Sequence, residues 1–227
     1  MRTIAIHQPE YLPWLGLIEK ARRADVFVLL DDVQFNRSSL QQRAKIAGSP
    51  TSWLTIPFVH KFPQMINEVR VVDVDWPTRH ADAVRAAYGQ APCFPSVWPE
   101  LELFYTSLAA AKHDKLVDSV IASVHLLFEA FGVTTEVFRS SAIGSEGAKS
   151  DRVLDICRRL GATRYLSGHG GSTYLDLAAF ADAGVEVALQ DFVPQTYRLG
   201  QPDPFGEGRG LSALDAWMYC DCVEVLK

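Results

Sequence analysis

The chain has 227 residues, of which 48% are hydrophobic, and its formal net charge is −5. This length and apolar content predict one large domain, or one domain with a subdomain, while the acidic balance excludes the broad basic surface that bulk nucleic-acid binding requires. The sequence shows no signal peptide and no run of ~18 apolar residues, which predicts a cytoplasmic protein with no membrane partner.

The N-terminal part predicts a strand–helix–strand unit. Apolar residues 4–6 form a first strand, residues 14–23 have helical periodicity, and the apolar residues 26–30 form a second strand. Residues 53–57 and 69–73 are typical of two further strands, and we expect no helix between them.

The middle of the chain changes to a helical pattern. Pro92, Pro95 and Pro99 interrupt this stretch, so three separate helices are expected. The predicted helices cover residues 78–88, 101–111 and 115–131. We interpret residues 77–131 as a helical insertion or cap on the sheet.

The C-terminal part returns to alternating strands and helices, with a strand expected at each end of every helix. Such consecutive βαβ units place their strands in parallel. The predicted strands are 134–138, 163–166 and 185–189, and the predicted helices are 150–160 and 173–183. A loop over residues 202–210 then leads to a short helix over 211–220, with Ser212 as its N-cap.

Together these elements predict an α/β fold with a mostly parallel sheet and flanking helices, of Rossmann-like or nucleotidyltransferase-like type. Residues 1–227 are treated as a single domain. Ligands of such sheets bind in the crevice beyond the carboxyl ends of the strands. Polar residues that follow the strands are therefore the candidate site.

The first strand ends in His7 and Gln8, ahead of a helix N-terminus that would stabilise an anion. His7 is a candidate catalytic residue that contacts phosphate or transfers a proton, and Gln8 is a candidate substrate-binding amide. The alternative is that both side chains close the strand end through hydrogen bonds to the backbone. Tyr11 and Trp14 are candidates for stacking on a sugar or a base, and they are equally good core residues.

The second strand ends in Asp31 and Asp32, which are candidate catalytic carboxylates. Adjacent strand residues point to opposite faces, so we expect the two to have different roles. Polar donors follow in the same region, and the guanidinium group of an arginine suits the binding of phosphate or carboxylate. The alternative interpretation is that these residues form a solvated charged loop without a ligand. The candidate substrate-binding residues here are Gln34, Asn36 and Arg43.

A third cluster follows the strand at 163–166, where a glycine-rich turn precedes a helix. Backbone N–H groups of such a turn can converge on an anion. The turn lacks the Gly-Lys-Ser/Thr of a P-loop and the third glycine of the dinucleotide fingerprint. His169 is also a candidate general base, with simple surface exposure as the alternative. The predicted substrate-binding residues are Ser167, Gly168, His169, Gly170, Gly171, Tyr174 and Asp176.

Metal ligation has little support in the sequence. The four cysteines lack the paired CxxC spacing of structural zinc sites, and the other histidines have no companions at a ligand spacing. We expect no metal site, and the cofactor is undetermined.

At these residues the chain resembles the WbqC-like protein family. The N-terminal resemblance lies in Ile6-His7-Gln8-Pro9-x-Tyr11-Leu12-Pro13-Trp14-x-Gly16, in the segment from Asp25 to Phe35, and in Arg43. The C-terminal resemblance lies in Tyr165-Leu166-Ser167-Gly168, Tyr174-Leu175-Asp176 and Gln190-Asp191-Phe192.

The resemblance implies a context of surface-polysaccharide and sugar modification without a defined reaction. The strand–His–loop–helix opening is also similar to the nucleotidyltransferase-like fold that carries an HxGH motif. However, His7 is followed by Tyr11-Leu12-Pro13-Trp14 without a second histidine. Adenylyl transfer by that motif is therefore not implied.

The leading hypothesis is a transferase whose small-molecule substrate carries a phosphate or nucleotide, with amino-sugar or aminoacyl modification as its chemistry. His7 would contact phosphate or act as acid or base, Asp31 or Asp32 would orient or deprotonate the acceptor, and Arg43 would bind an anion. The turn over residues 167–171 would hold the second substrate. The alternatives are a non-catalytic small-molecule-binding protein and an ATP-dependent amide-forming ligase.

Overall fold

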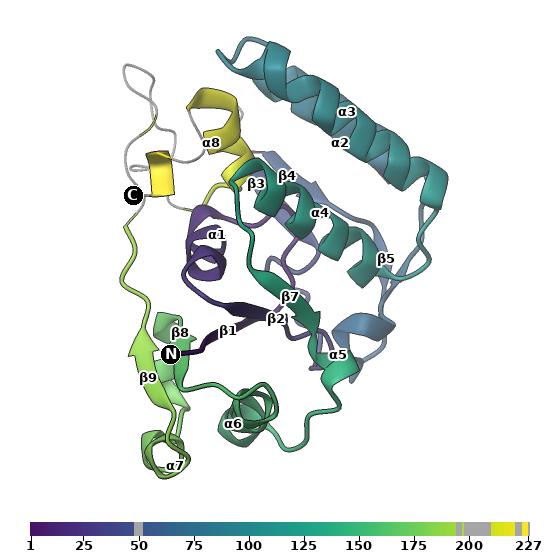
Figure 1. The fold of residues 1–227 in the computed structure, drawn as a ribbon. Helices are drawn as coiled ribbons and strands as arrows, with labels where there is room; N and C mark the ends of the chain where they lie inside the picture. Colours follow the sequence, from purple (N-terminus) through teal and green to yellow (C-terminus); the bar gives the residue numbers. More distant parts are fainter. Residues whose placement is uncertain (48–51, 194–196, 198–209, 221–223, 227) are drawn as a thin grey trace. The chain divides into compact units, whose positions relative to one another are not determined.

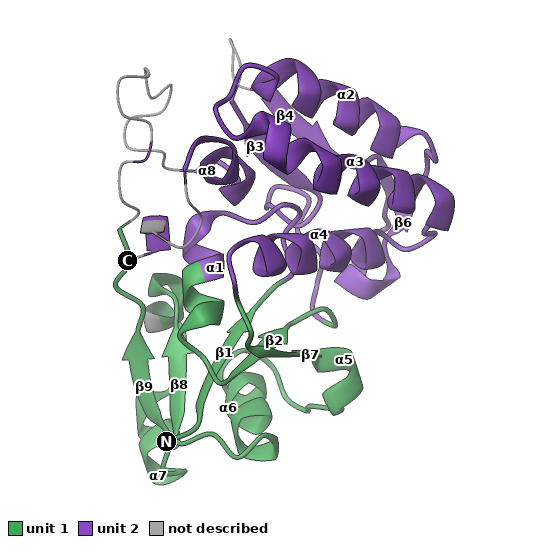
Figure 2. Cartoon of the chain, turned by 45° about the horizontal axis from the view of Figure 1, so that its top comes forward, with its two compact units in different colours: residues 1–8, 19–32, 133–193 green, residues 9–18, 33–132, 194–227 purple. Residues whose placement is uncertain are grey.

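The computed structural model describes residues 1–47, 52–193, 197, 210–220 and 224–226, without the side chains of Ser172 and Glu224 (Figure 1). The chain divides into two compact units, coloured separately in Figure 2. Unit 1 comprises residues 1–8, 19–32 and 133–193, and unit 2 comprises residues 9–18, 33–132 and 194–227. The predicted helical segment 77–131 lies within unit 2. That the chain acts as one domain stays a prediction.

Unit 1 contains an all-parallel sheet of five strands, which confirms the predicted α/β fold. The strand order is β7-β2-β1-β8-β9 (Figure 1). The chain thus starts in the middle of the sheet, moves outward to one edge, and then returns to build the other side. The strands are β1 (Thr3–His7), β2 (Val26–Leu29), β7 (Glu136–Arg139), β8 (Arg164–Ser167) and β9 (Glu186–Leu189).

The core of unit 1 forms where helices pack on one face of this sheet. Because side chains alternate along a strand, Ile4 and Ile6 of β1 share a face with each other, as do Val26 and Val28 of β2. All four are buried in one cluster with apolar residues of α6 (Lys149–Arg159) and with Phe180 of α7 (Leu177–Asp182). A short helix, α5 (Ser140–Ile143), follows β7 and was not predicted.

The helix predicted over 173–183 begins later than expected. A short 3-10 helix, η2 (His169–Thr173), comes first, and α7 starts at Leu177. The side chain of Asp176 accepts a hydrogen bond from the backbone N–H of Ala179 at 3.1 Å, which fixes the N-terminus of α7. The periodicity continued across this cap, so the prediction placed the start too early.

Unit 2 contains two small antiparallel pairs and several helices. The pairs are β3 (Arg43–Ile46) with β4 (Ser52–Thr55), and β5 (Phe58–Val59) with β6 (Arg70–Val71). β3 and β5 were not predicted, and the strands expected at 53–57 and 69–73 are shorter than expected. The expectation of no helix between those two strands is wrong, because a 3-10 helix over residues 66–68 lies between β5 and β6. The helices are η1 (Ile66–Glu68), α2 (Trp76–Tyr88), α3 (Phe94–Ala111), α4 (Leu116–Ala130), α8 (Ala213–Tyr219) and η3 (Glu224–Leu226), while α1 (Leu15–Arg22) has residues in both units.

The prolines of the middle segment interrupt its helices less than predicted. α3 begins at Phe94 rather than near residue 101, with Pro95 in its first turn and Pro99 inside it. The first turn of a helix has no intrahelical partner for its N–H groups, so Pro95 removes no bond there. Ser212 caps α8 as predicted, accepting from Leu214 N at 3.1 Å. Of the predicted loop over 202–210, all but Gly210 lies outside the described residues.

Candidate functional site

A cavity of about 360 Å³ lies at the carboxyl ends of β1 and β8 in unit 1. The strand order reverses between these two strands, and ligands of open α/β sheets bind at such a switch point. The volume is within the range of small-molecule sites. The lining residues are Ile6, His7, Gln8, Lys20, Leu30, Val153, Tyr165, Ser167, Gly168, Gly170, Gly171 and Tyr174. The structure therefore brings together seven of the predicted site residues, from both ends of the chain.

His7 is the last residue of β1 and its imidazole is held by its neighbour. The ring Nδ1 lies 2.9 Å from the carbonyl oxygen of Gln8. Since a carbonyl only accepts, Nδ1 carries the proton and Nε2 carries the lone pair in the neutral ring. Burial and then the nearby charge of Lys20 lower the pKa of His7 to about 4, against the smaller opposing effect of the Gln8 bond. At neutral pH the ring is a neutral base.

Lys20 is a site residue that the sequence analysis did not identify. Its side chain reaches the cavity from α1, the residue is only 3% exposed, and Nζ donates to the carbonyl oxygen of Ile6 at 2.8 Å. In the sequence it lies among the basic residues at the end of a helix, where cations favour the helix dipole and contact solvent. No local pattern distinguishes it from Arg22, which is exposed.

The glycine-rich turn forms the other wall of the cavity. Ser167 is buried, its Oγ donates to the carbonyl of Gly168 at 3.0 Å, and the N–H of Gly171 donates to the same carbonyl at 2.9 Å. A Cβ on Gly171 would overlap Ser167 Oγ and lie 3.1 Å from Leu175 Cδ1, whereas a Cβ on Gly168 or Gly170 would meet nothing within 4 Å. The turn is thus tightly packed at Gly171 and open at the other two glycines.

Two phenols complete this wall. Tyr165, a lining residue not on the predicted list, shares side-chain hydrogen bonds with Ser167 and with Tyr174. Burial raises the pKa of both phenols, so they are neutral hydroxyls at physiological pH. They supply polar contacts without charge.

Two predicted residues of the glycine cluster are not among the lining residues. His169 is exposed on η2, and Asp176 is exposed and caps α7 through its bond from Ala179. The cap gives Asp176 a structural role. The substrate-binding role predicted for each stays a prediction.

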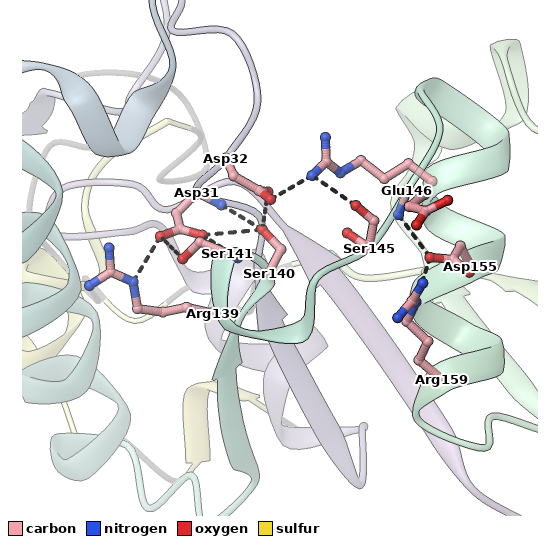
Figure 3. Close-up of polar contacts among 10 residues, drawn as sticks. Asp31, Asp32, Arg139, Ser140, Ser141, Ser145, Glu146, Asp155 and Arg159 are labelled. Carbon is pink, nitrogen blue, oxygen red and sulfur yellow. Dashed lines mark hydrogen bonds and ion pairs between the residues drawn. The ribbon is translucent and has the colours of Figure 1, made fainter.

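Asp31 and Asp32 belong to a separate polar network in unit 1, shown in Figure 3. Asp31 is fully buried and accepts bonds from Arg139 Nε at 2.8 Å, Ser141 N at 3.0 Å and Ser141 Oγ at 2.9 Å. Burial alone raises the pKa of Asp31, but these bonds outweigh it and hold the pKa below its usual value. Asp32 pairs with Arg152 on α6 and with the hydroxyl of Ser140.

The expectation that Asp31 and Asp32 point to opposite faces is wrong. β2 ends at Leu29, so strand alternation no longer applies at these positions. The hydroxyl of Ser140 contacts both carboxylates, at 3.2 Å for Asp31. Asp31 and Asp32 thus both join α5 to the end of β2, Asp32 also joins α6 through Arg152, and neither aspartate is among the residues that line the cavity. Their predicted catalytic role remains untested.

Tyr11 and Trp14 lie in unit 2. Tyr11 is a buried core residue whose hydroxyl lies 2.9 Å from His80 Nδ1 and 3.3 Å from the hydroxyl of Tyr105. Its ring also packs edge-on against Trp76. Trp14 is half-buried and folds over Gly16, where a Cβ would overlap the indole. For Tyr11 these contacts favour the core role that the sequence left open.

The predicted donors that follow β2 also lie in unit 2. Arg43 Nη2 and Nε donate to the carbonyls of Ser38 and Ser39 at 2.7 and 3.2 Å, and its guanidinium stacks over Trp53. Asn36 is exposed and its Oδ1 accepts from Ser38 N at 2.9 Å. Gln34 is exposed and forms an isolated antiparallel bridge with Met65. These contacts organise the loop, and the ligand roles stay predictions.

The described residues contain neither a membrane-spanning helix nor a cluster of metal ligands. Among them no helix is both long enough and apolar enough to cross a membrane. Nor does any group of three or more His, Cys, Asp or Glu side chains within those ranges have an arrangement that would hold a metal ion.

Fold and site together define an α/β protein with a small-molecule-sized cavity at the switch point of a parallel sheet. The chain belongs to the WbqC-like protein family, whose model matches residues 8–226. It is similar to the uncharacterized protein Rv1507c of Mycobacterium tuberculosis (strain ATCC 25618 / H37Rv), with 26% identity over 195 residues that cover 85% of this chain and 83% of that protein. No solved structure matched the chain.

The packing of the turn predicts unequal effects of two glycine substitutions. Gly171→Ala should displace Ser167 Oγ from its bond to Gly168 and lower the free energy of unfolding by about 1–3 kcal/mol, as overpacking typically does. Gly170→Ala, in open space in the same turn, is the matched control and should change it little. Urea unfolding measures both, and equal losses would contradict the packing.

The buried ion pair of Asp31 predicts a structural cost. Asp31→Asn should lower the free energy of unfolding at pH 7 by about 2 kcal/mol, below the usual range for a broken buried pair because Arg139 is partly exposed. Asp73→Asn, which breaks the exposed pair with Arg79, should have little effect. The comparison uses urea unfolding of both variants, and a neutral Asp31→Asn would argue against the network.

The low pKa of His7 predicts acid sensitivity of the fold. Between the folded pKa of about 4 and the unfolded value near 6.5, the unfolded chain binds more protons, so stability is complete above pH 6.5 and falls as the pH drops. Between pH 7.5 and pH 5, the free energy of unfolding of His7→Asn should therefore fall by about 2 kcal/mol less than that of the wild type. Chemical unfolding at both pH values tests this, and identical losses would refute it.

Proposed function

We propose that this protein is a transferase that binds a phosphate- or nucleotide-bearing small molecule in the switch-point cavity. The proposal is carried by one observation: the polar ends of two adjacent strands line the same cavity, with His7 and Gln8 at the end of β1 and Ser167, Gly168, Gly170 and Gly171 at the end of β8. In this proposal the reaction modifies an amino sugar or transfers an aminoacyl group, in surface-polysaccharide or related biosynthesis in the cytoplasm.

His7 is the proposed general base. Its neutral ring presents Nε2 as the basic nitrogen, because Nδ1–H is donated to Gln8. Nε2 takes the proton from the acceptor hydroxyl or amine as that atom bonds to the transferred group. The bond to the leaving group breaks at the same centre, and the leaving group departs with the electron pair. The amide of Gln8 and the turn after β8 orient the two substrates.

Non-catalytic binding is a second candidate, and one observation favours it. None of the described lining residues is Asp or Glu, and the two aspartates predicted to be catalytic are held by Arg139 and Arg152. A cavity with a single imidazole can bind an anion without transforming it. The experiment below distinguishes the two candidates.

The transferase proposal predicts that His7→Asn lowers kcat by about 10²-fold or more while ligand binding is largely retained, since a general base typically contributes 10²–10⁴-fold. Ligands that survive purification are first identified by mass spectrometry, and they guide the choice of nucleotide-sugar and aminoacyl donors. Turnover is then followed by mass spectrometry of the product. His113→Asn, outside the cavity, is the matched control and should keep wild-type turnover.

Two results would decide against this function. Unchanged turnover in His7→Asn would remove the general base. Thermal stabilisation of the wild type by a donor, with no product from any donor and acceptor pair, would favour the binding protein instead.

A further inference from the structure

We propose that Lys20 is the residue that binds the phosphate group of the substrate in the switch-point cavity. This inference rests on the proposed function, since it assigns the anionic part of that substrate to one side chain. Lys20 stands at the cavity together with His7, although the two are 13 positions apart in the sequence. The charge, the burial and the surrounding donors each support the assignment.

The charge of the cavity differs from that of the chain. The whole chain carries a net charge of −5. Among the described residues that line the cavity, however, none is Asp, Glu or Arg, and the positively charged side chain is that of Lys20. His7 and the two tyrosines are neutral at physiological pH. The cavity therefore offers a positive charge to a ligand in an otherwise acidic protein.

Helix stability does not account for the position of Lys20. Arg22 and Arg23 are exposed at the end of α1, where they complement the helix dipole and remain hydrated. Lys20 is 3% exposed, and moving an ammonium group out of water is costly. Its bond to the Ile6 carbonyl holds the charge at the end of β1. A charged side chain among a few placed polar groups is typical of small-molecule pockets.

The surrounding donors suit phosphate. Tyr174 supplies a hydroxyl, Gln8 supplies an amide, and the glycines at 168 and 170 leave room for a close approach of the ligand to the backbone. A terminal phosphate has three oxygens and needs several donors. The volume of about 360 Å³ lies near the lower end of ligand pockets and suits a small monophosphate.

Phosphate binding would also raise the pKa of His7. The charge of Lys20 is the second cause of the low pKa of His7, after burial. A bound anion offsets that charge, so the pKa of His7 rises toward its usual value and the imidazole becomes a stronger base. The other titratable side chains among the described lining residues are Tyr165 and Tyr174, both neutral phenols. The response of His7 is thus a direct readout of an anion beside Lys20.

Inorganic phosphate is the probe, titrated into the wild type, Lys20→Met and Lys61→Met at fixed ionic strength, with chloride as the reference salt. Lys61 is exposed in unit 2, so Lys61→Met makes the same charge change away from the cavity. The readouts are Tm and the NMR signals of the His7 ring, assigned with His7→Asn. We expect saturable shifts in the wild type and Lys61→Met, and at least about tenfold weaker binding in Lys20→Met.

Equal phosphate affinity in Lys20→Met and the wild type would overturn the assignment, as would a wild-type His7 signal that phosphate does not change. If Lys20→Met fails to fold, the wild type still decides: a pKa of His7 that is the same in phosphate and in chloride overturns the inference, and a raised pKa supports it.

The two proposals can fail separately. Lys20-dependent phosphate binding without product from any donor would refute the transferase and leave the phosphate site standing. Turnover that requires His7, with phosphate binding that is indifferent to Lys20→Met, would refute the phosphate site and leave the transferase standing.

Discussion

The parallel pairing of β1 with both β2 and β8 is the interaction on which the site depends. Ala5 pairs with Phe27 on one side and with Leu166 on the other. Continuing the second register by two residues brings His7 level with Gly168. Backbone pairing therefore aligns the histidine with the glycine-rich turn before any side-chain contact is made. Because the strand order reverses at this pair, the space beyond the strand ends is available to a ligand.

Unit 1 buries charges in two different ways. Asp31 has hydrogen bonds from a guanidinium, a hydroxyl and a backbone N–H, so its desolvation is offset within the protein. Lys20 instead lines a cavity, where its ammonium group donates to the carbonyl of Ile6 and a neutral imidazole is nearby. The first arrangement stabilises the end of β2. The second places a positive charge where a ligand can reach it.

Sequence reasoning found the parts of the site that are local in the chain. Apolar runs that end in polar residues located the ends of β1 and β8, and hence His7 and Ser167. It missed Lys20, because the burial of a helix residue depends on what packs around it. It also did not identify the partners of Asp31 and Asp32, since Arg139 and Arg152 are more than 100 positions away. Such partners leave no trace in a local pattern.

The N-terminal family signature contains residues with two different tasks. His7 and Gln8 line the cavity of unit 1, whereas Tyr11 is buried in unit 2 beside His80. Leu12 has a φ of 41°, a left-handed conformation that is unfavourable for a leucine, and its N–H donates to Ser123 Oγ at 2.9 Å. The first residues of the motif thus line the cavity at the end of β1, and the later residues stabilise the core of unit 2. Residues that identify the family need not bind its ligand, because some of them, such as Tyr11, stabilise the fold instead.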